Sequence, residues 1–329
     1  MTKLRITTIN GEWMNDWFGI NGNGDVIFKD SFKEHGSGKL MDTDRTATRL
    51  SSLIEKIEPD IIGIQEGPSA IDEMLLFINT YLDSKYSCEI GTDGRSQKLF
   101  ALYKKSFFDD VTRVDHSYPH WTFDNDGDYI LDDGSFARTP LEVIFTINGK
   151  KVRVIDNHFK SSYINGGKTM WNDPNKRTEF IKESLINRRR MTMEAIQLRK
   201  HVGETLITEP NTIIMGEIND GPGKEFFENY MLGMDITSEL LGNTYYPETI
   251  FKHVLDLEHD FSAIFNDFVE GNPEKKVLLD RILVSQSLYP SVIGCNVEYQ
   301  KYDSLVENPN RRDGRPTDHR PITMNLELS

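Results

Sequence analysis

The sequence predicts a protein of the α/β class, because short strand-like runs alternate with amphipathic helical stretches along the chain. The strand-like runs are rich in apolar and β-branched residues and have turn residues nearby. Asn148-Gly149 is a hairpin signal between two of these runs, which argues against a purely parallel, doubly wound sheet. The predicted strands are Leu4–Ile9, Ile61–Gln65, Leu99–Tyr103, Leu141–Ile147, Val152–Asp156, Thr212–Met215, Leu278–Val284 and Ile322–Leu328.

Three stretches carry apolar residues at helical spacing. The first, Thr43–Glu58, is followed by Pro59, which is typical of a helix end. Ala70–Leu82 and Arg188–Val202 repeat the same spacing. Three further segments are rich in Gly, Asn, Asp and Lys, which suits surface loops that border a site. These segments are Gly11–Asp42, Ser161–Asn187 and Gly242–Lys276.

The composition is that of a water-soluble globular protein, with 37% hydrophobic and 27% charged residues in a chain of 329. No repeat, low-complexity tract or Pro/Ser-rich linker divides the chain, so we expect a single domain over residues 1–329. No apolar run approaches the roughly 18 residues that span a bilayer, so we expect no membrane association. The first residues, MTKLRITTIN, lack the features of a signal peptide, and we therefore expect a cytoplasmic protein.

The net charge of −14 makes tight nonspecific binding to nucleic acid unfavourable. It does not exclude a nuclease, because carboxylates that hold a divalent cation contribute to such a total. The two cysteines, Cys88 and Cys295, are far apart and form no Cys-x-x-Cys pair. Zinc and thioredoxin-type chemistry are therefore unsupported, and we expect two reduced, buried thiols.

Several apolar strands are followed by polar residues that suit chemistry. Each motif alone has an ordinary explanation, such as a solvated carboxylate or a structural histidine. Together, they place Glu, His, Asn and Asp at strand ends, where α/β architectures place their sites. The motifs are Ile61 to Glu66, Val154 to His158, Ile213 to Asp220, Leu278 to Arg281 and Pro316 to Pro321.

The ordered set of motifs resembles the endonuclease/exonuclease/phosphatase superfamily, which includes pancreatic-type deoxyribonuclease and abasic-site endonucleases. The segment Ser135–Phe145 resembles the deoxyribonuclease branch in particular. The resemblance implies a four-layer α/β/β/α sandwich of two mixed β-sheets flanked by helices. It also implies a metal-dependent phosphoric ester hydrolase with one catalytic domain. The residues that carry it are Asn10, Gln65-Glu66, Ser135 to Arg138, His158, Gly216 to Asn219, Asp280 and Asp318-His319.

By this resemblance, Glu66 is the main metal ligand, and Asn10 and Asp318 assist it. Such hard oxygen ligands suit Mg²⁺, with Mn²⁺ as a substitute. The metal would neutralise a phosphate oxygen and stabilise the leaving alkoxide.

The remaining site residues follow from the same resemblance. Asp280 would hydrogen-bond His319 and fix its tautomer. His158 would bind or protonate the phosphate, and Asn219 would orient the phosphate or the attacking water. Arg138, together with Lys160, would hold the phosphate through charge-assisted hydrogen bonds.

Glu217 departs from the superfamily pattern, which has Gly-Asp-x-Asn where this chain has Gly216-Glu217-Ile218-Asn219. The expected Asp positions or activates the nucleophilic water. Glu displaces the carboxylate by about a bond length, and a misplacement on the order of 1 Å can cost about 10²-fold in rate. Glu217 is then either a natural variant with adjusted geometry or a change that weakens turnover. We expect Glu217→Asp to raise or preserve activity.

Three functions remain open. The first is a nuclease that cuts DNA or RNA, favoured by the Ser135–Phe145 resemblance and by a cluster of basic residues after His158. The second is a phosphatase or phosphodiesterase that acts on a small molecule or a lipid head group. The third is a binding protein with the same fold, whose catalytic site is weakened by Glu217. Aromatic residues in the loops could stack on bases or anchor the loops. No protein partner is predicted. The basic residues are Lys160, Lys168, Lys176, Arg177 and Arg188 to Arg190, and the aromatic residues are Trp13, Trp17, Phe18, Trp121 and Trp171.

Overall fold

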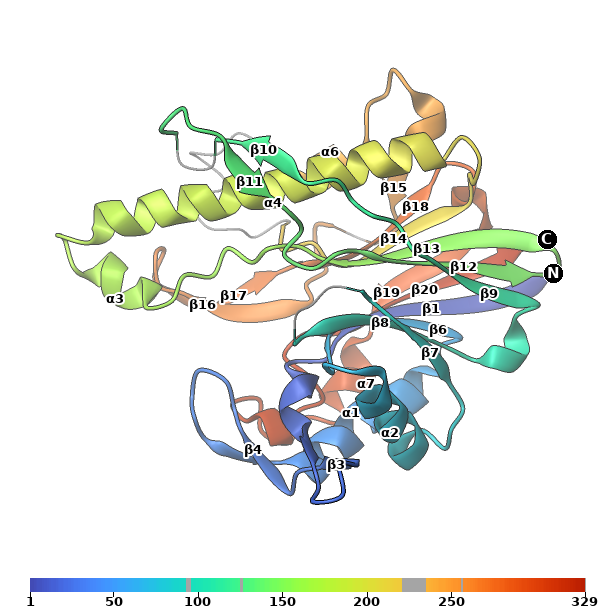
Figure 1. Ribbon diagram of the computed structural model, residues 1–329, viewed down its shortest axis with the longest axis horizontal. Coiled ribbons are helices and arrows are strands. Elements are labelled where there is room, and N and C mark those ends of the chain that lie inside the picture. The colour runs from blue at the N-terminus through green and yellow to red at the C-terminus, as the bar shows by residue number, and fades with distance from the viewer. Residues whose placement is uncertain (93–95, 125–126, 221–234, 256, 329) are drawn as a thin grey trace.

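The computed structural model describes residues 1–92, 96–124, 127–220, 235–255 and 257–328. It confirms the predicted fold class. Two six-stranded mixed sheets pack face to face, and helices cover both outer faces (Figure 1). The predicted strands are all present, although the run from Leu278 enters its strand only at Asp280.

The first sheet has the strand order β19-β20-β1-β6-β8-β7. Only β1 and β6 are parallel among its neighbouring pairs, so both end at the same edge, where Asn10 pairs with Gln65. The strands are β1 (Thr2–Asn10), β6 (Ile61–Gly67), β7 (Ser87–Ile90), β8 (Lys98–Tyr103), β19 (Val292–Val297) and β20 (Ile322–Leu328).

The second sheet has the order β15-β18-β14-β13-β12-β9. Its central strands β13 and β14 are parallel, and β18 runs antiparallel beside β14. This register places His158 opposite Glu217, and Glu217 opposite Asp280. The strands are β9 (Asp110–Val114), β12 (Leu141–Ile147), β13 (Lys150–His158), β14 (Thr212–Glu217), β15 (Phe251–His253) and β18 (Asp280–Ser285).

The main apolar core lies between the two sheets, with Ile6 and Met324 from the first sheet and Phe145 and Ile282 from the second. A glycine allows the sheets to approach closely near the site. A Cβ on Gly63 of β6 would lie 2.5 Å from Met215 Cε and 2.9 Å from Asp156 Oδ1 of the other sheet. Any larger residue there would displace the ends of the Met215 and Asp156 side chains.

The helix α1 (Thr43–Ile57) begins at Asp42, whose carboxylate accepts a hydrogen bond from Arg45 N, and ends at Glu58 with φ 55°. It packs on the first sheet with α2 (Ile71–Tyr81), and α7 (Tyr299–Asp303) contacts α1. On the opposite outer face lie α4 (Arg177–Thr205) and the shorter α6 (Ile236–Leu241), and α3 (Gly167–Asn172) precedes α4 (Figure 1).

The prediction of a loop over Ser161–Asn187 is wrong for most of its length, because α3 spans Gly167–Asn172 and α4 begins at Arg177 rather than Arg188. The first turns of α4 are mostly polar and extend beyond the sheet (Figure 1), so they carry little of the apolar periodicity that identifies a helix.

The other two predicted loop segments contain short strands and 3₁₀ turns. No helix in the described part of the chain is long and apolar enough to cross a membrane. The remaining elements are β2 (Phe18–Ile20), β3 (Val26–Phe28), β4 (Ser31–Lys33), β5 (Leu40–Asp42), β10 (Trp121–Phe123), β11 (Asp132–Gly134), β16 (Ala263–Asp267), β17 (Asn272–Val277), η1 (Met14–Trp17), η2 (Lys105–Phe107), η3 (Pro247–Thr249), η4 (Tyr289–Ser291) and η5 (Arg312–Gly314).

Candidate active site

Polar side chains from both sheets meet where β1, β6, β13 and β14 end and β18 begins. A hydrogen bond of 2.6 Å from Asn10 Nδ2 to Glu217 Oε2 joins the two sheets there. The same Glu217 oxygen lies 3.3 Å from His158 Nε2. The structure therefore brings together strand ends that the sequence separates by more than two hundred positions.

Glu66, His158 and Glu217 form a compact group, since one potential ligand atom from each lies within 4.8 Å of the others. Burial, together with the carboxylates of Glu217 and Asp318, raises the pKa of Glu66 to about 8. Burial also raises the pKa of Glu217, and Asp280 and Asp318 add to the effect. Neighbouring carboxylates that repel one another fit a bound cation, because a cation would remove the repulsion.

Asn10 uses its amide within the protein. Its Oδ1 accepts a hydrogen bond of 2.7 Å from Glu12 N, while its Nδ2 donates to Glu217. Its backbone carbonyl accepts from Thr317 Oγ1 at 2.6 Å, which attaches the end of β1 to the loop that carries Asp318. Asn10 thus orients Glu217, and its backbone is bonded to the loop that carries the exposed Asp318.

Asp280 and His319 form a close pair, with 2.8 Å between Asp280 Oδ2 and His319 Nδ1. Burial opposes charge on the His319 ring, but the carboxylates of Asp280, Glu217 and Asp318 outweigh it. They hold the pKa of His319 well above its usual range. The pair fixes the ring and leaves Nε2 for a further partner.

His158 has the opposite electrostatics. Burial and the positive charges of Arg138, His319 and Lys160 hold its pKa well below the usual range, so the ring is neutral. Its Nδ1 has no hydrogen-bond partner among the described residues. A neutral imidazole beside Glu217 can donate a hydrogen bond from Nε2.

Arg138 and Lys160 lie in two loops that one buried carboxylate connects. Glu194 of α4 accepts hydrogen bonds from Ala137 N at 2.6 Å and from Lys160 N at 2.7 Å. Arg138 donates to Gln97 Oε1 at 2.6 Å, and its charge acts on Glu66. The sequence interpretation did not include Glu194, although a carboxylate within the apolar stripe of a predicted helix is a signal that could have found it.

Two site residues have left-handed backbones that are uncommon outside glycine. Glu66 and Asn219 both have φ 54°. The pairing of β6 with β8 shifts register beside Glu66, and Asn219 Nδ2 donates to Phe159 O at 2.9 Å. Such conformations are unfavourable and persist only where the surrounding structure holds them. They are common at functional sites.

Two arginines of the predicted basic cluster have partners within the protein. Arg188 is buried and pairs with Asp220 at 2.8 Å, and Arg177 stacks over the Trp171 ring at 4.7 Å. Among the aromatic candidates, Trp17, Phe18 and Trp121 are buried. The two cysteines are free thiols, as expected, although Cys295 is only partly buried.

No family model and no curated protein matches the sequence. Solved structures do match over almost the whole chain. Truncated TDP2 from Caenorhabditis elegans has a TM-score of 0.54 at 15% identity, covering 99% of this chain and 98% of that one. The 3′-5′ exonuclease NExo from Neisseria meningitidis has a TM-score of 0.54 at 14% identity, covering 99% and 100%. An endonuclease/exonuclease/phosphatase from Bacteroides vulgatus has a TM-score of 0.51 at 14% identity, covering 100% of both chains.

The chain has the endonuclease/exonuclease/phosphatase fold. The four-layer sandwich expected from the motifs is thereby confirmed. At the end of the sheets, the structure brings Glu217 close to five of the predicted site residues, which are Asn10, Glu66, His158, Asp280 and His319. The fold alone does not establish the roles of these residues in a reaction. Those roles are argued from the chemistry of the side chains.

Proposed function

We propose that the chain is a metal-dependent phosphodiesterase whose single catalytic domain, residues 1–329, cuts DNA. The observation that carries the proposal is the convergence of the Asp280–His319 pair with the carboxylates of Glu66 and Glu217. A charged, oriented imidazole beside a group of carboxylates suits the hydrolysis of a phosphate ester.

Glu66, Asp318 and the neighbouring Glu217 would hold Mg²⁺, for which Mn²⁺ could substitute, because they supply hard oxygen ligands. The bound cation would supply charge neutralisation at the phosphate. Glu217 is included because its carboxylate lies with Glu66 and His158 within 4.8 Å. Asn10 would position Glu217 through the hydrogen bond of 2.6 Å.

The side chains around this group divide the remaining work. His319, held by Asp280, would bind the phosphate with its second ring nitrogen, and neutral His158 would donate a hydrogen bond to it. Arg138 would contribute its guanidinium, and Lys160 would add positive charge nearby. Asn219, fixed by its hydrogen bond to Phe159 O, would orient the phosphate or the attacking water.

DNA is the proposed substrate for two reasons. Ser135–Phe145 resembles the deoxyribonuclease branch, and neighbours with the same fold have been solved with DNA. One such structure is TDP2 from D. rerio complexed with single strand DNA product, which matches this chain with a TM-score of 0.52. Another is NExo from Neisseria bound to a product DNA hairpin, which matches with a TM-score of 0.50. The cytoplasmic location predicted from the sequence stays a prediction.

The test is hydrolysis of plasmid DNA, DNA and RNA oligonucleotides, bis(p-nitrophenyl) phosphate and a soluble phosphomonoester, each with Mg²⁺, with Mn²⁺ and with EDTA. We expect metal-dependent cutting of DNA and of the diester. Metal-dependent phosphate release from the monoester without cut nucleic acid would replace this proposal with a small-molecule phosphatase. An absence of turnover, including in Glu217→Asp, would favour the binding protein.

A further inference from the structure

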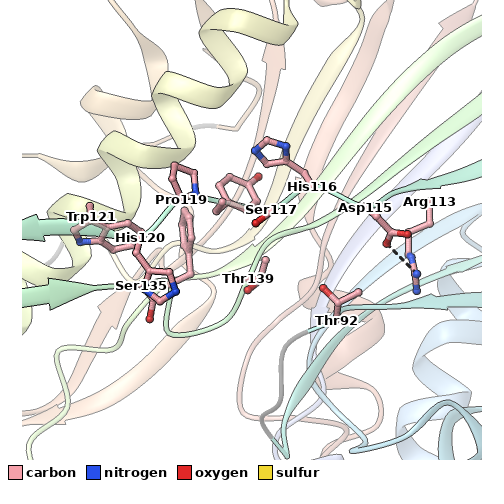
Figure 2. Close-up of a pocket in the computed structure, with 12 residues that line it drawn as sticks. Thr92, Arg113, Asp115, His116, Ser117, Pro119, His120, Trp121, Ser135 and Thr139 are labelled. Carbon is pink, nitrogen blue, oxygen red and sulfur yellow. Dashed lines mark ion pairs between the residues drawn. The ribbon is translucent and has the colours of Figure 1, made fainter.

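A cavity of about 500 Å³ opens between two segments of the chain, residues 113–121 and 135–139. In Figure 2, Trp121, His120 and Ser135 lie at one end of it and Arg113 and Asp115 at the other. This volume is in the range of small-molecule sites, and it is too small for a duplex.

Rings in fixed positions form one wall of the cavity. Tyr118 packs edge-on against Phe136 with 4.7 Å between ring centroids, and its hydroxyl donates to Glu142 Oε1 at 2.7 Å. Trp121 packs edge-on against Phe136 at 5.3 Å. A Cβ on Gly134 would lie 2.0 Å from Trp121 Nε1, so the absence of a side chain there gives the indole its position. Ring packing and one hydrogen bond therefore set the positions of these side chains.

The rest of the lining is polar but has little net charge. Ser117, Ser135 and Thr139 supply hydroxyls, and His120 is exposed. Among the described residues that line the cavity, the cation Arg113 pairs with Asp115 at 2.9 Å. This lining does not suit a phosphate. It suits a flat, uncharged ring with hydrogen-bonding edges, because such a ring can stack on aromatic residues and bond to hydroxyls.

The loop that carries Arg138 connects the cavity with the candidate active site. Phe136 and Thr139 line the cavity, and Arg138 lies between them in sequence. Phe136 is two residues from Arg138, so their Cα atoms are at most roughly 7 Å apart. Arg138 in turn acts electrostatically on Glu66 and His158. A nucleotide strand held at Arg138 would therefore have a neighbouring base within reach of the cavity.

We propose that this cavity binds one unpaired nucleobase next to the scissile phosphate, and that the substrate is therefore single-stranded DNA or an unpaired end of DNA. The proposal rests on the proposed function and narrows it. A base inside a duplex would first have to be unstacked and unpaired, which disfavours a duplex substrate.

The first experiment tests the protein side. His120→Ala removes an exposed ring from the cavity, and Tyr245→Ala removes an exposed ring outside it as the matched control. We expect His120→Ala to lower kcat/KM for a single-stranded oligonucleotide about 10-fold relative to kcat/KM for bis(p-nitrophenyl) phosphate, which has no base. Tyr245→Ala should leave that ratio at the wild-type value. An unchanged ratio in His120→Ala would overturn the proposal.

The second experiment tests the DNA side without catalysis. Fluorescence anisotropy in EDTA measures binding of a labelled single strand that carries one abasic position, moved step by step along the strand. We expect one position at which base loss weakens binding to wild type by about 10-fold but has little effect on His120→Ala. Equal binding for every abasic position, or tighter binding of a blunt duplex, would contradict a base-binding cavity.

The two proposals fail in different ways. Base-dependent binding without hydrolysis of either substrate would contradict the proposed phosphodiesterase activity and support the proposal that the cavity binds a base. Hydrolysis of bis(p-nitrophenyl) phosphate and DNA with no dependence on any single base would support the proposed phosphodiesterase activity and contradict the proposal that the cavity binds a base.

Discussion

Asn10 Nδ2 and Glu217 Oε2 form a hydrogen bond of 2.6 Å between the last residue of β1 and the last residue of β14, and this bond links the two sheets at the candidate site. Both side chains are buried, at 3% and 5% exposure. The longer side chain at position 217 thus has a defined partner.

Glu217→Asp should lower activity. The sequence favoured the opposite result, because the superfamily pattern has Asp at this position. Shortening the side chain by one methylene withdraws the carboxylate from Asn10 Nδ2 at 2.6 Å and His158 Nε2 at 3.3 Å. A displacement on the order of 1 Å can cost about 10²-fold. We expect kcat for bis(p-nitrophenyl) phosphate to fall by about 10-fold or more.

The control for this variant is Glu307→Asp, an exposed carboxylate that pairs with Arg45 and Arg49. It should retain wild-type kcat. A rise in kcat for Glu217→Asp would restore the sequence-based expectation and show that the contacts of Glu217 hold the carboxylate in an unproductive place.

Asp280→Asn should reduce turnover strongly while the protein still folds. The amide keeps the size of the side chain but removes the charge 2.8 Å from His319 Nδ1, and it can present an N–H where an acceptor is needed. We expect kcat to fall about 10²-fold to 10⁴-fold. Asp303→Asn, which removes an exposed partner of Arg320, is the matched control. Wild-type kcat in Asp280→Asn would show that His319 needs no carboxylate partner.

Glu194→Gln should change how stability depends on pH. Burial raises the pKa of Glu194 from 4.5 to about 7, although two backbone N–H groups and Arg138 favour its charged form. The folded state therefore holds this proton more tightly than the unfolded state. The stabilisation is fully present below about pH 4.5 and is lost as the pH rises through about 7.

The measurement is the free energy of unfolding in urea at pH 5 and pH 8, in EDTA. Gln carries no proton to lose, so the stability of wild type relative to Glu194→Gln should fall between these pH values by roughly 3 kcal/mol at most. A difference that stays constant across this range would mean that the pKa of Glu194 is not raised.

Arg312→Lys should destabilise the protein and lower activity together. The buried Arg312 guanidinium donates to Gly11 O at 3.0 Å and to Pro316 O at 2.8 Å, and it lies over the Trp17 ring. These bonds fix the loops next to Asn10 and Asp318. The single ammonium group of lysine cannot donate in the same fixed directions as the planar guanidinium. We therefore expect the free energy of unfolding to fall by about 2 kcal/mol and kcat to fall by about 10-fold.

Arg311→Lys is the control, because Arg311 is the preceding residue and its guanidinium is far more exposed. Thermal unfolding and kcat are measured for both variants. Equal effects in the two variants would show that the buried guanidinium has no special role in holding the site.

The eight predicted strands and two of the three predicted helices match observed elements to within about two residues, because their buried faces impose periodicity on the sequence. Four strands of the two main sheets, β7, β9, β15 and β19, were not predicted. The start of α4 was missed where the helix extends past the sheet and buries little besides Phe180. Similarly, Arg188 belonged to a basic run in the sequence, yet it lies buried against Asp220. A charged residue gives no local sign of whether its partner will be substrate or protein.

The sequence by itself determined the α/β class and the residue types that gather at the strand ends, since both depend on local patterns of apolar and polar residues. Only the tertiary structure decided how those residues combine. The tertiary structure places Asn10 within hydrogen-bond distance of Glu217 and bonds the backbone of Ala137 and Lys160 to Glu194. It also forms the cavity lined by Phe136 and Thr139, on either side of Arg138 in the sequence. The physical reason is that these contacts join segments far apart in the chain, and their geometry depends on how the two sheets pack and on where Gly63 allows close approach.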